Sequence, residues 1–147
     1  MGTLPDPFVH TESVFTRMSK LLGLKFESEH DVVRAVAAGI SAGTYKRVVK
    51  KLKISAVLVA SESTVRRRLA SNSRFTADES ERVVRLTRVF AEATQLFGNE
   101  EAALKWLNTP GEYVPKHIPI TPMTLAATDS GARLVESYLY KTAHGIY

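Results

Sequence analysis

Apolar side chains recur every three or four positions along the first part of the chain, which is the spacing of one helix face. The apolar run after Thr11 predicts a first helix, with Thr11 as its N-cap and Gly23 at its end. A second short helix is expected between Ser28 and Gly39, because Ser28 precedes Asp31 by three residues in a pattern similar to a capping box. Neither segment shows the alternation of a strand.

The next segment combines an apolar stripe with a strongly basic surface. In "GTYKRVVKKLKI", Tyr45, Val48, Val49 and Leu52 share one helical face, and the five lysines and arginines occupy the remaining surface. The stretch "ISAVLVAS" that follows fits a short helix or a strand by its period alone. Its helical neighbours favour the short helix.

Three consecutive arginines belong to a helix that is predicted to begin after Ser61. The stretch "STVRRRL" places Val65 and Leu69 on one face of this helix, so Ser63 and Arg67 point away from that face and the other two arginines lie on its flanks. The three guanidinium groups therefore cannot share one face.

The longest helix is expected to begin at the capping box "TADE", which starts at Thr76, and to end at Gly98. Its apolar stripe runs from Val83 to Phe97, and Asn99 can cap the helix that follows. Three prolines in "GEYVPKHIPITPM" predict an ordered, extended connection, after which a short helix and a last helix complete the chain. The pattern predicts an all-α fold with two halves, residues 1–75 and 76–147, joined through the long helix.

Composition limits the compartment. The 147 residues include no cysteine, which removes disulfides and zinc–thiolate sites and fits a reducing compartment. No basic leader followed by an apolar run opens the sequence, and no stretch approaches the ~18 consecutive apolar residues of a membrane span. We therefore expect a cytoplasmic protein without a membrane partner.

The net charge of +5 is unevenly distributed. Residues 1–90 carry 16 Lys and Arg against 9 Asp and Glu, whereas residues 91–147 carry 4 against 6. Nine cations and the single anion Glu62 lie between Thr44 and Arg74. Such a cluster attracts polyanions through phosphate contacts and counterion release, although a solvated basic surface is the simpler alternative.

Motifs for catalysis are missing from the sequence. The four histidines lie far apart, and none stands in a ligand motif such as H-E-x-x-H. There is no G-x-S-x-G turn, P-loop or Gly-rich phosphate-binding loop. We therefore expect no metal, no cofactor and no enzymatic activity.

The basic segment has the order of a helix-turn-helix: a basic amphipathic helix, a short apolar element, a turn and a Ser-capped helix. Residues near the N-terminus of a recognition helix contact base edges, and flanking cations contact phosphates. Arg67 and Ser63 are the expected base readers, and Arg66 and Arg68 are expected to contact phosphates or residues of the chain itself. The predicted DNA-binding residues are Lys46, Arg47, Lys50, Ser63, Thr64, Arg66, Arg67 and Arg68.

From about Asp31 to its C-terminus, the sequence resembles the Xre/MbcA/ParS antitoxins, in particular the Xre-type partners of RES-domain toxins. The resemblance rests on "STVRRRL", on "FTADESERVVRLTRVFAEATQLFGNEEAALKWLNTP" and on "TPMTLAATDSGARLVESYLYKTAHGIY". It implies a helix-turn-helix half and a C-terminal toxin-binding domain. The chain departs from the family between Ile40 and Thr64, where it is several residues shorter and carries Val59-Ala60 in place of the usual turn glycine.

The resemblance also implies a function. Antitoxins of this family neutralise a cognate toxin, and many repress their own operon as dimers. RES toxins resemble ADP-ribosyltransferases and consume NAD, so the expected partners are a RES-domain toxin, operator DNA and a second copy of the chain. By the family pattern, the toxin-binding residues are Arg133, Glu136, Lys141, His144, Gly145, Ile146 and Tyr147.

Two alternatives stay open at this point. The end "KTAHGIY" is expected to enter the toxin's active site with Tyr147, unless its last residues pack back on the final helix. A stand-alone helix-turn-helix regulator, with a C-terminal half that serves only for dimerisation or effector response, is the alternative function.

Overall fold

The computed structural model describes residues 12–145, and over that range the fold is all-α, as the sequence predicts. In chain order the elements are α2 (Val14–Leu22), α3 (Glu29–Ala38), α4 (Ala42–Leu52), the 3-10 turn η1 (Ala56–Leu58), α5 (Glu62–Ala70), α6 (Ala77–Phe97), α7 (Glu100–Leu107), α8 (Pro122–Leu125) and α9 (Asp129–Ala143).

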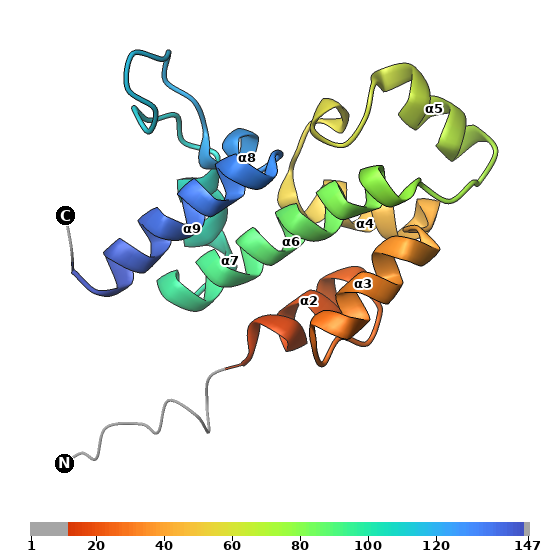
Figure 1. Ribbon diagram of the computed structural model, residues 1–147, viewed down its shortest axis with the longest axis horizontal. Coiled ribbons are helices and arrows are strands. Elements are labelled where there is room, and N and C mark those ends of the chain that lie inside the picture. Colours follow the sequence, from red (N-terminus) through yellow and green to blue (C-terminus); the bar gives the residue numbers. More distant parts are fainter. Residues whose placement is uncertain (1–11, 146–147) are drawn as a thin grey trace.

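The long helix α6 lies at the centre, with α2 and α3 against one side and α9 against another (Figure 1). α4 and α7 also pack against α6. Because both predicted halves pack on this one helix, a single cluster of buried apolar side chains runs through the described residues. The division of the chain at residue 75 stays a prediction, since α6 belongs to the core of both parts.

α6 is buried over a wider face than its apolar stripe predicts. Val83 and Phe90 are buried as expected, but Thr87 and Thr94 are also almost fully buried. Each threonine hydroxyl donates a hydrogen bond of 2.8 Å to a backbone carbonyl one turn earlier in the helix. These bonds satisfy the hydroxyls without solvent, so polar residues can face the core.

Side-chain caps fix most helix starts. At Thr76 the predicted capping box is complete, because Thr76 accepts from the backbone N–H of Glu79 and the Glu79 carboxylate accepts from that of Thr76. The Thr11 cap is a wrong prediction: Thr11 lies outside the described residues, and the side chain that caps α2 is Ser13, which accepts from the N–H of Thr16 at 3.0 Å.

The start of α3 only partly follows its predicted capping box. The Ser28 side chain makes no cap hydrogen bond. The Asp31 carboxylate accepts from the backbone N–H of Glu27 at 2.8 Å, one residue before the expected donor. The acidic half of the motif therefore forms and the serine half does not.

The segment "ISAVLVAS" is helical, as its neighbours favoured, but only for the single 3-10 turn η1. Lys53 ends α4 in the left-handed backbone region with a φ of 55°, which turns the chain sharply before η1. The first helix of the predicted helix-turn-helix pair is thus followed by one short turn before α5 begins.

The proline-rich connection between α7 and α8 is ordered and extended, as predicted. An antiparallel bridge closes its base, where Gly111 and Ile120 exchange backbone hydrogen bonds of 3.1 and 3.0 Å. The Tyr138 hydroxyl of α9 donates to the carbonyl of Tyr113 at 3.3 Å. This loop projects from the domain beside α8 and α9 (Figure 1).

Candidate functional sites

The helix α5 projects from the helical body (Figure 1) and packs mainly against η1. Its start is fixed by Ser61, whose Oγ accepts from the N–H of Thr64 at 3.2 Å. Val65 faces inward and is buried, whereas Ser63 and Arg67 are exposed, as predicted for the face turned away from the core. The N-terminal turn of α5 is therefore open to a ligand.

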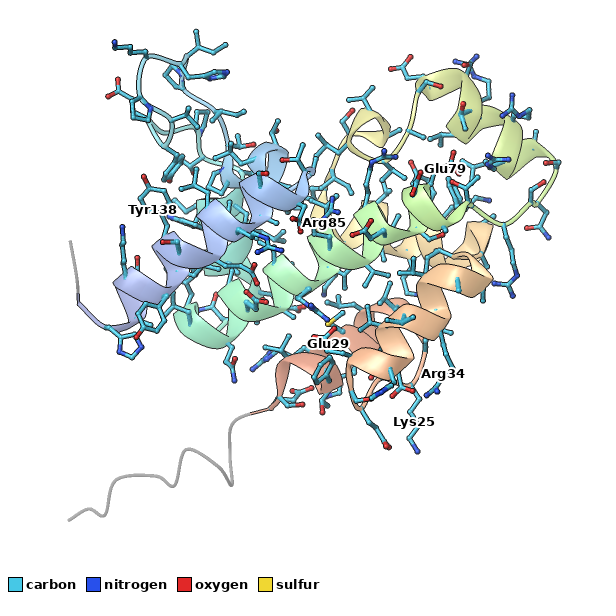
Figure 2. The ribbon with its side chains drawn as sticks, viewed as in Figure 1. Lys25, Glu29, Arg34, Glu79, Arg85 and Tyr138 are labelled. Carbon is cyan, nitrogen blue, oxygen red and sulfur yellow. The ribbon has the colours of Figure 1, made fainter. Side chains whose placement is uncertain are left out.

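The three arginines of α5 have different surroundings. Arg66 and Arg67 are exposed and form no ion pair with any residue between 12 and 145. Arg68 is half-buried and donates through Nε and Nη2 to the two carboxylate oxygens of Glu79, at 3.1 and 3.3 Å. This fork attaches α5 to the first turn of α6, where Figure 2 labels Glu79.

The Glu79 carboxylate has two structural roles: it pairs with Arg68 of α5, and it accepts from the Thr76 backbone at the start of α6. Burial on its own raises the pKa of Glu79, but the hydrogen bonds from Arg68 and from the Thr76 backbone outweigh it, so the pKa lies below its ordinary value. The carboxylate stays ionised at neutral pH. The turn between η1 and α5 is held as well, because Arg82 of α6 donates to the carbonyl of Val59 at 2.9 Å.

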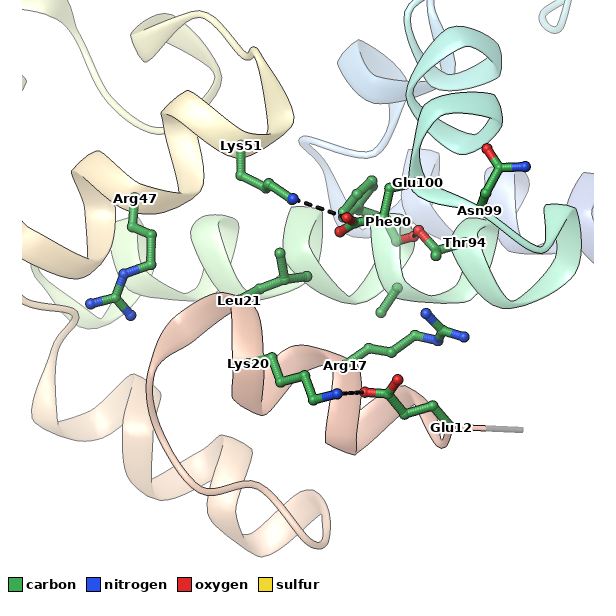
Figure 3. A pocket seen from close by; sticks show the side chains of 11 residues that line it. Glu12, Arg17, Lys20, Leu21, Arg47, Lys51, Phe90, Thr94, Asn99 and Glu100 are labelled. Atoms are coloured by element: carbon green, nitrogen blue, oxygen red, sulfur yellow. Dashed lines mark hydrogen bonds and ion pairs between the residues drawn. The ribbon is translucent and has the colours of Figure 1, made fainter. Parts of the chain in front are cut away.

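The cations of α4 lie in two rows. Arg47 and Lys51 are one turn apart and face α2 and α7: the Arg47 guanidinium lies over Gly23, and Lys51 pairs with Glu100 at 2.9 Å. Lys46 and Lys50 form the neighbouring row, are exposed, and pair with no carboxylate in the described part of the chain. All four side chains are exposed, so the basic surface predicted for this helix is present, but only one of its two rows, Arg47 and Lys51 in Figure 3, lies beside other helices.

The residues predicted to bind the toxin are spread over α9 and its end. Arg133 is exposed and donates to Asp129 at 3.1 Å. Lys141 lies 5.7 Å from the centre of the Tyr138 ring, and the His144 ring lies 4.2 Å from that of Tyr140. Gly145 follows with a φ of 65°, and the predicted residues Ile146 and Tyr147 lie outside the described residues.

Glu136 differs from its neighbours because it is half-buried against Glu92 of α6. Burial, followed by the hydrogen bond to Glu136 and its charge, raises the pKa of Glu92 to about 8, although Arg88 opposes the shift. At neutral pH Glu92 therefore keeps its proton. One feature of the sequence indicates this pair: Glu92 stands between Ala91 and Ala93, which are both buried in the core.

Aromatic rings connect α6, α7, the extended loop and α9. Ring centres are 5.8 Å apart for Phe97 and Trp106, 6.2 Å for Trp106 and Tyr113, and 5.1 Å for Tyr113 and Tyr138. Trp106 and Tyr138 are partly buried in this chain of rings. The contacts brace the loop against α9.

The described residues include neither a candidate metal site nor a candidate membrane span. Between residues 12 and 145, no group of three or more His, Cys, Asp or Glu side chains is placed to hold a metal ion. Within the same range, none of the helices has the length and apolar character needed to cross a membrane.

The C-terminal part of the chain is similar to a known family of domains. Residues 92–145, which include the end of α6 and all of α7, α8 and α9, match the family described as the antitoxin Xre/MbcA/ParS C-terminal toxin-binding domain. The match is to a toxin-binding domain alone and covers less than half of the chain.

Three curated proteins, each named Antitoxin Xre, are similar over a longer stretch. The protein of Photorhabdus laumondii is 34% identical over 96 residues, which cover 65% of this chain and 61% of the relative. That of Yersinia enterocolitica is 34% identical over 90 residues, covering 60% and 58%, and that of Pseudomonas putida is 33% identical over 82 residues, covering 56% and 50%. The chain thus spans half to three fifths of the length of these relatives.

Proposed function

We propose that this protein is the antitoxin of a type II toxin–antitoxin system, and that it neutralises a cognate RES-domain, NAD-degrading toxin by covering the toxin's active site. The observation that carries this proposal is the match of residues 92–145 to a family of toxin-binding domains. Those residues form the end of α6, the helices α7 to α9 and the braced loop.

The exposed positions of α9 are the proposed contacts with the toxin. Arg133, Lys141 and His144 are solvent-exposed, and the apolar Tyr140 beside them is 62% exposed. An exposed aromatic ring among cations is typical of a protein-binding surface. Glu136 is turned toward Glu92, so we assign it an indirect role through the position of α9.

Co-purification tests the partnership. The full chain, expressed with an affinity tag together with the cognate RES-domain toxin, is expected to retain the toxin through size-exclusion chromatography as one complex. Arg133→Glu should weaken the complex, while Arg34→Glu should not. Arg34 is the matched control because both arginines are exposed, at 73% and 78%, and each pairs with an aspartate near the start of its own helix. A toxin that elutes separately from the wild-type chain contradicts the proposal.

We further propose that the chain binds operator DNA through α5 and so represses its own transcription. The supporting observation is the exposed surface of α5, which carries Ser63 in its first turn and Arg66 and Arg67 further along, both arginines being without an ion pair among residues 12–145. Lys46, Lys50 and the exposed Arg47 would supply phosphate contacts, whereas Arg68 is paired with Glu79. A mobility-shift experiment with the promoter region upstream of the gene tests this: a specific shift supports the proposal, and equal affinity for random duplexes contradicts it.

A further inference from the structure

The connection between α7 and α8 carries an exposed and largely apolar tip, residues 115–119, at its far end. All five residues of this loop tip, Pro-Lys-His-Ile-Pro, are exposed. Ile118 is 76% exposed, more than any other large apolar side chain between residues 12 and 145. A single exposed apolar residue is common on protein surfaces, but here an isoleucine and two prolines are exposed together on a segment that projects from the helices (Figure 1).

The loop tip is built on a tight turn. The N–H of His117 donates to the carbonyl of Val114 at 3.2 Å, which closes a four-residue turn with Pro115 and Lys116 at its centre. Lys116 has a φ of 62°, as the third residue of a type II turn requires, and glycine or asparagine usually occupies that position. Proline is favoured just before it, because its ring fixes φ at about −65°. A lysine in this conformation is strained, so the rest of the loop must hold the turn.

Contacts at the base of the loop hold the tip in place. The bridge between Gly111 and Ile120 closes the base, and the Tyr138 hydroxyl of α9 donates to the carbonyl of Tyr113 at 3.3 Å. The rings of these two tyrosines also pack edge to face, with their centres 5.1 Å apart. An apolar side chain that a rigid loop presents loses little conformational freedom on binding. The loop tip is therefore suited to insert into a preformed pocket of a partner.

Two observations indicate which partner this is. The loop tip lies within residues 92–145, which match a family of toxin-binding domains, and its base is joined to α9. Lys116 at the tip pairs with no carboxylate among residues 12–145, so a partner with an acidic group beside an apolar pocket complements it. The family description names no residue of this loop as a contact.

We propose that the loop tip docks on the toxin, with Ile118 seated in an apolar pocket of the toxin and Lys116 beside an acidic group at the rim of that pocket. This inference rests on the proposed function and adds a second contact to the exposed positions of α9. A buried apolar anchor with a charged neighbour at the rim is a common source of binding energy at protein interfaces.

Isothermal titration calorimetry of the full chain with the purified cognate RES-domain toxin tests the docking. Ile118→Ser should raise the dissociation constant about tenfold or more because the burial of the side chain is lost, whereas Ile118→Leu should stay within about threefold of the wild type. Lys116→Glu should weaken binding most at low salt, since salt screens an exposed charge. Val33→Ser is the matched control: Val33 is 67% exposed on α3, outside the matched range, and this variant should bind the toxin as the wild type does.

A fluorescent label at the loop tip reports directly on contact. The chain has no cysteine, so a single introduced cysteine is labelled alone. His117→Cys carrying bimane should shift its emission to shorter wavelength when the toxin is added, because the tip leaves water. The same label on Val33→Cys should show no shift. An unchanged spectrum at position 117 in the formed complex would overturn the docking.

The outcomes separate this inference from the proposed function. If the wild-type chain does not bind the toxin, both fail. If the wild type binds, and Ile118→Ser with an unchanged thermal unfolding curve binds equally well, only the docking of the tip is overturned. Equal losses for Ile118→Ser and Val33→Ser would also overturn it. If Ile118→Ser converts a dimer of the free chain into a monomer in sedimentation, the tip binds a second copy and the toxin contact is wrong.

Discussion

The carboxyl pair of Glu92 and Glu136 is the residue-scale feature with the clearest dependence on pH. Folding raises the pKa of Glu92 from an ordinary value of 4.5 to about 8, so the folded chain keeps this proton longer than the unfolded chain. The contribution of Glu92 to the free energy of unfolding is therefore complete below about pH 4.5, and it is lost as the pH rises to about 8. Above that pH, two charges repel at the contact between α6 and α9.

Glu92→Gln removes this dependence because the amide keeps the shape and does not ionise. Between about pH 5 and about pH 9, the free energy of unfolding of the wild type should fall by on the order of a few kcal/mol relative to that of the variant. Urea unfolding at both pH values measures this difference. Glu101→Gln, at an exposed position of α7, is the control and should follow the wild type. Parallel curves for wild type and Glu92→Gln would show that folding does not raise the pKa of Glu92.

Glu79 is the second residue with a specific energetic role. Its carboxylate accepts from Arg68 and from the Thr76 backbone, so Glu79→Gln disturbs both the attachment of α5 and the cap of α6. We expect a loss of ~1 to 3 kcal/mol of stability in thermal or urea unfolding. Glu81→Gln, which breaks the exposed pair with Arg85 in the same helix, should cost less than about 0.5 kcal/mol. Equal losses for the two variants would remove the special role of Glu79.

Residue-scale features were predictable where they depend on neighbours in the sequence. The capping box at Thr76 and the cap at Asn99 follow from residues three positions apart, and both form. The sequence did not predict that Arg68 pairs with Glu79. The two residues lie eleven positions apart, and they meet only because the chain turns between α5 and α6. Similarly, Glu92 and Glu136 meet only when α9 packs on α6.

At the scale of elements, α5 is the proposed recognition helix. Arg67→Ala should lower the affinity for the operator by ~1 to 3 kcal/mol and leave binding to random DNA nearly unchanged. Lys50→Ala should weaken binding to all duplexes alike and reduce the dependence on salt. Fluorescence anisotropy with both duplexes at several salt concentrations separates the two effects. Equal losses on operator and random DNA for both variants would count against base reading by Arg67.

The elements themselves follow closely from the apolar pattern, with two limits. The stripe of α6 predicted one buried face, whereas Thr87 and Thr94 are buried because their hydroxyls bond within the helix. The cations of α4 lie on its outer surface as expected, but the sequence did not predict that Lys51 pairs with Glu100 of α7 or that Arg47 lies over Gly23. Both limits arise because the hydrophobic period of a helix does not show which other elements pack against it.

At the scale of the whole molecule, α6 links the two proposed activities. It carries Glu79, which holds α5, at its start, and it begins the match to the toxin-binding family near its end. Helix-turn-helix proteins usually bind paired half-sites as dimers, so two copies of the chain are expected on one operator. Sedimentation of the chain with a duplex of operator length should give two chains per duplex. A single chain per duplex at saturation contradicts the symmetric arrangement.

Inhibition of the cognate RES-domain toxin tests the central claim most directly. NAD consumption by the purified toxin should stop when the wild-type chain is added in stoichiometric amount, and Arg34→Glu should inhibit equally well. Arg133→Glu and Lys141→Glu should each require about tenfold or more additional chain for the same inhibition, because they reverse charge on the exposed face of α9. The account would be contradicted if the toxin consumed NAD at its full rate in the presence of an excess of the folded wild-type chain.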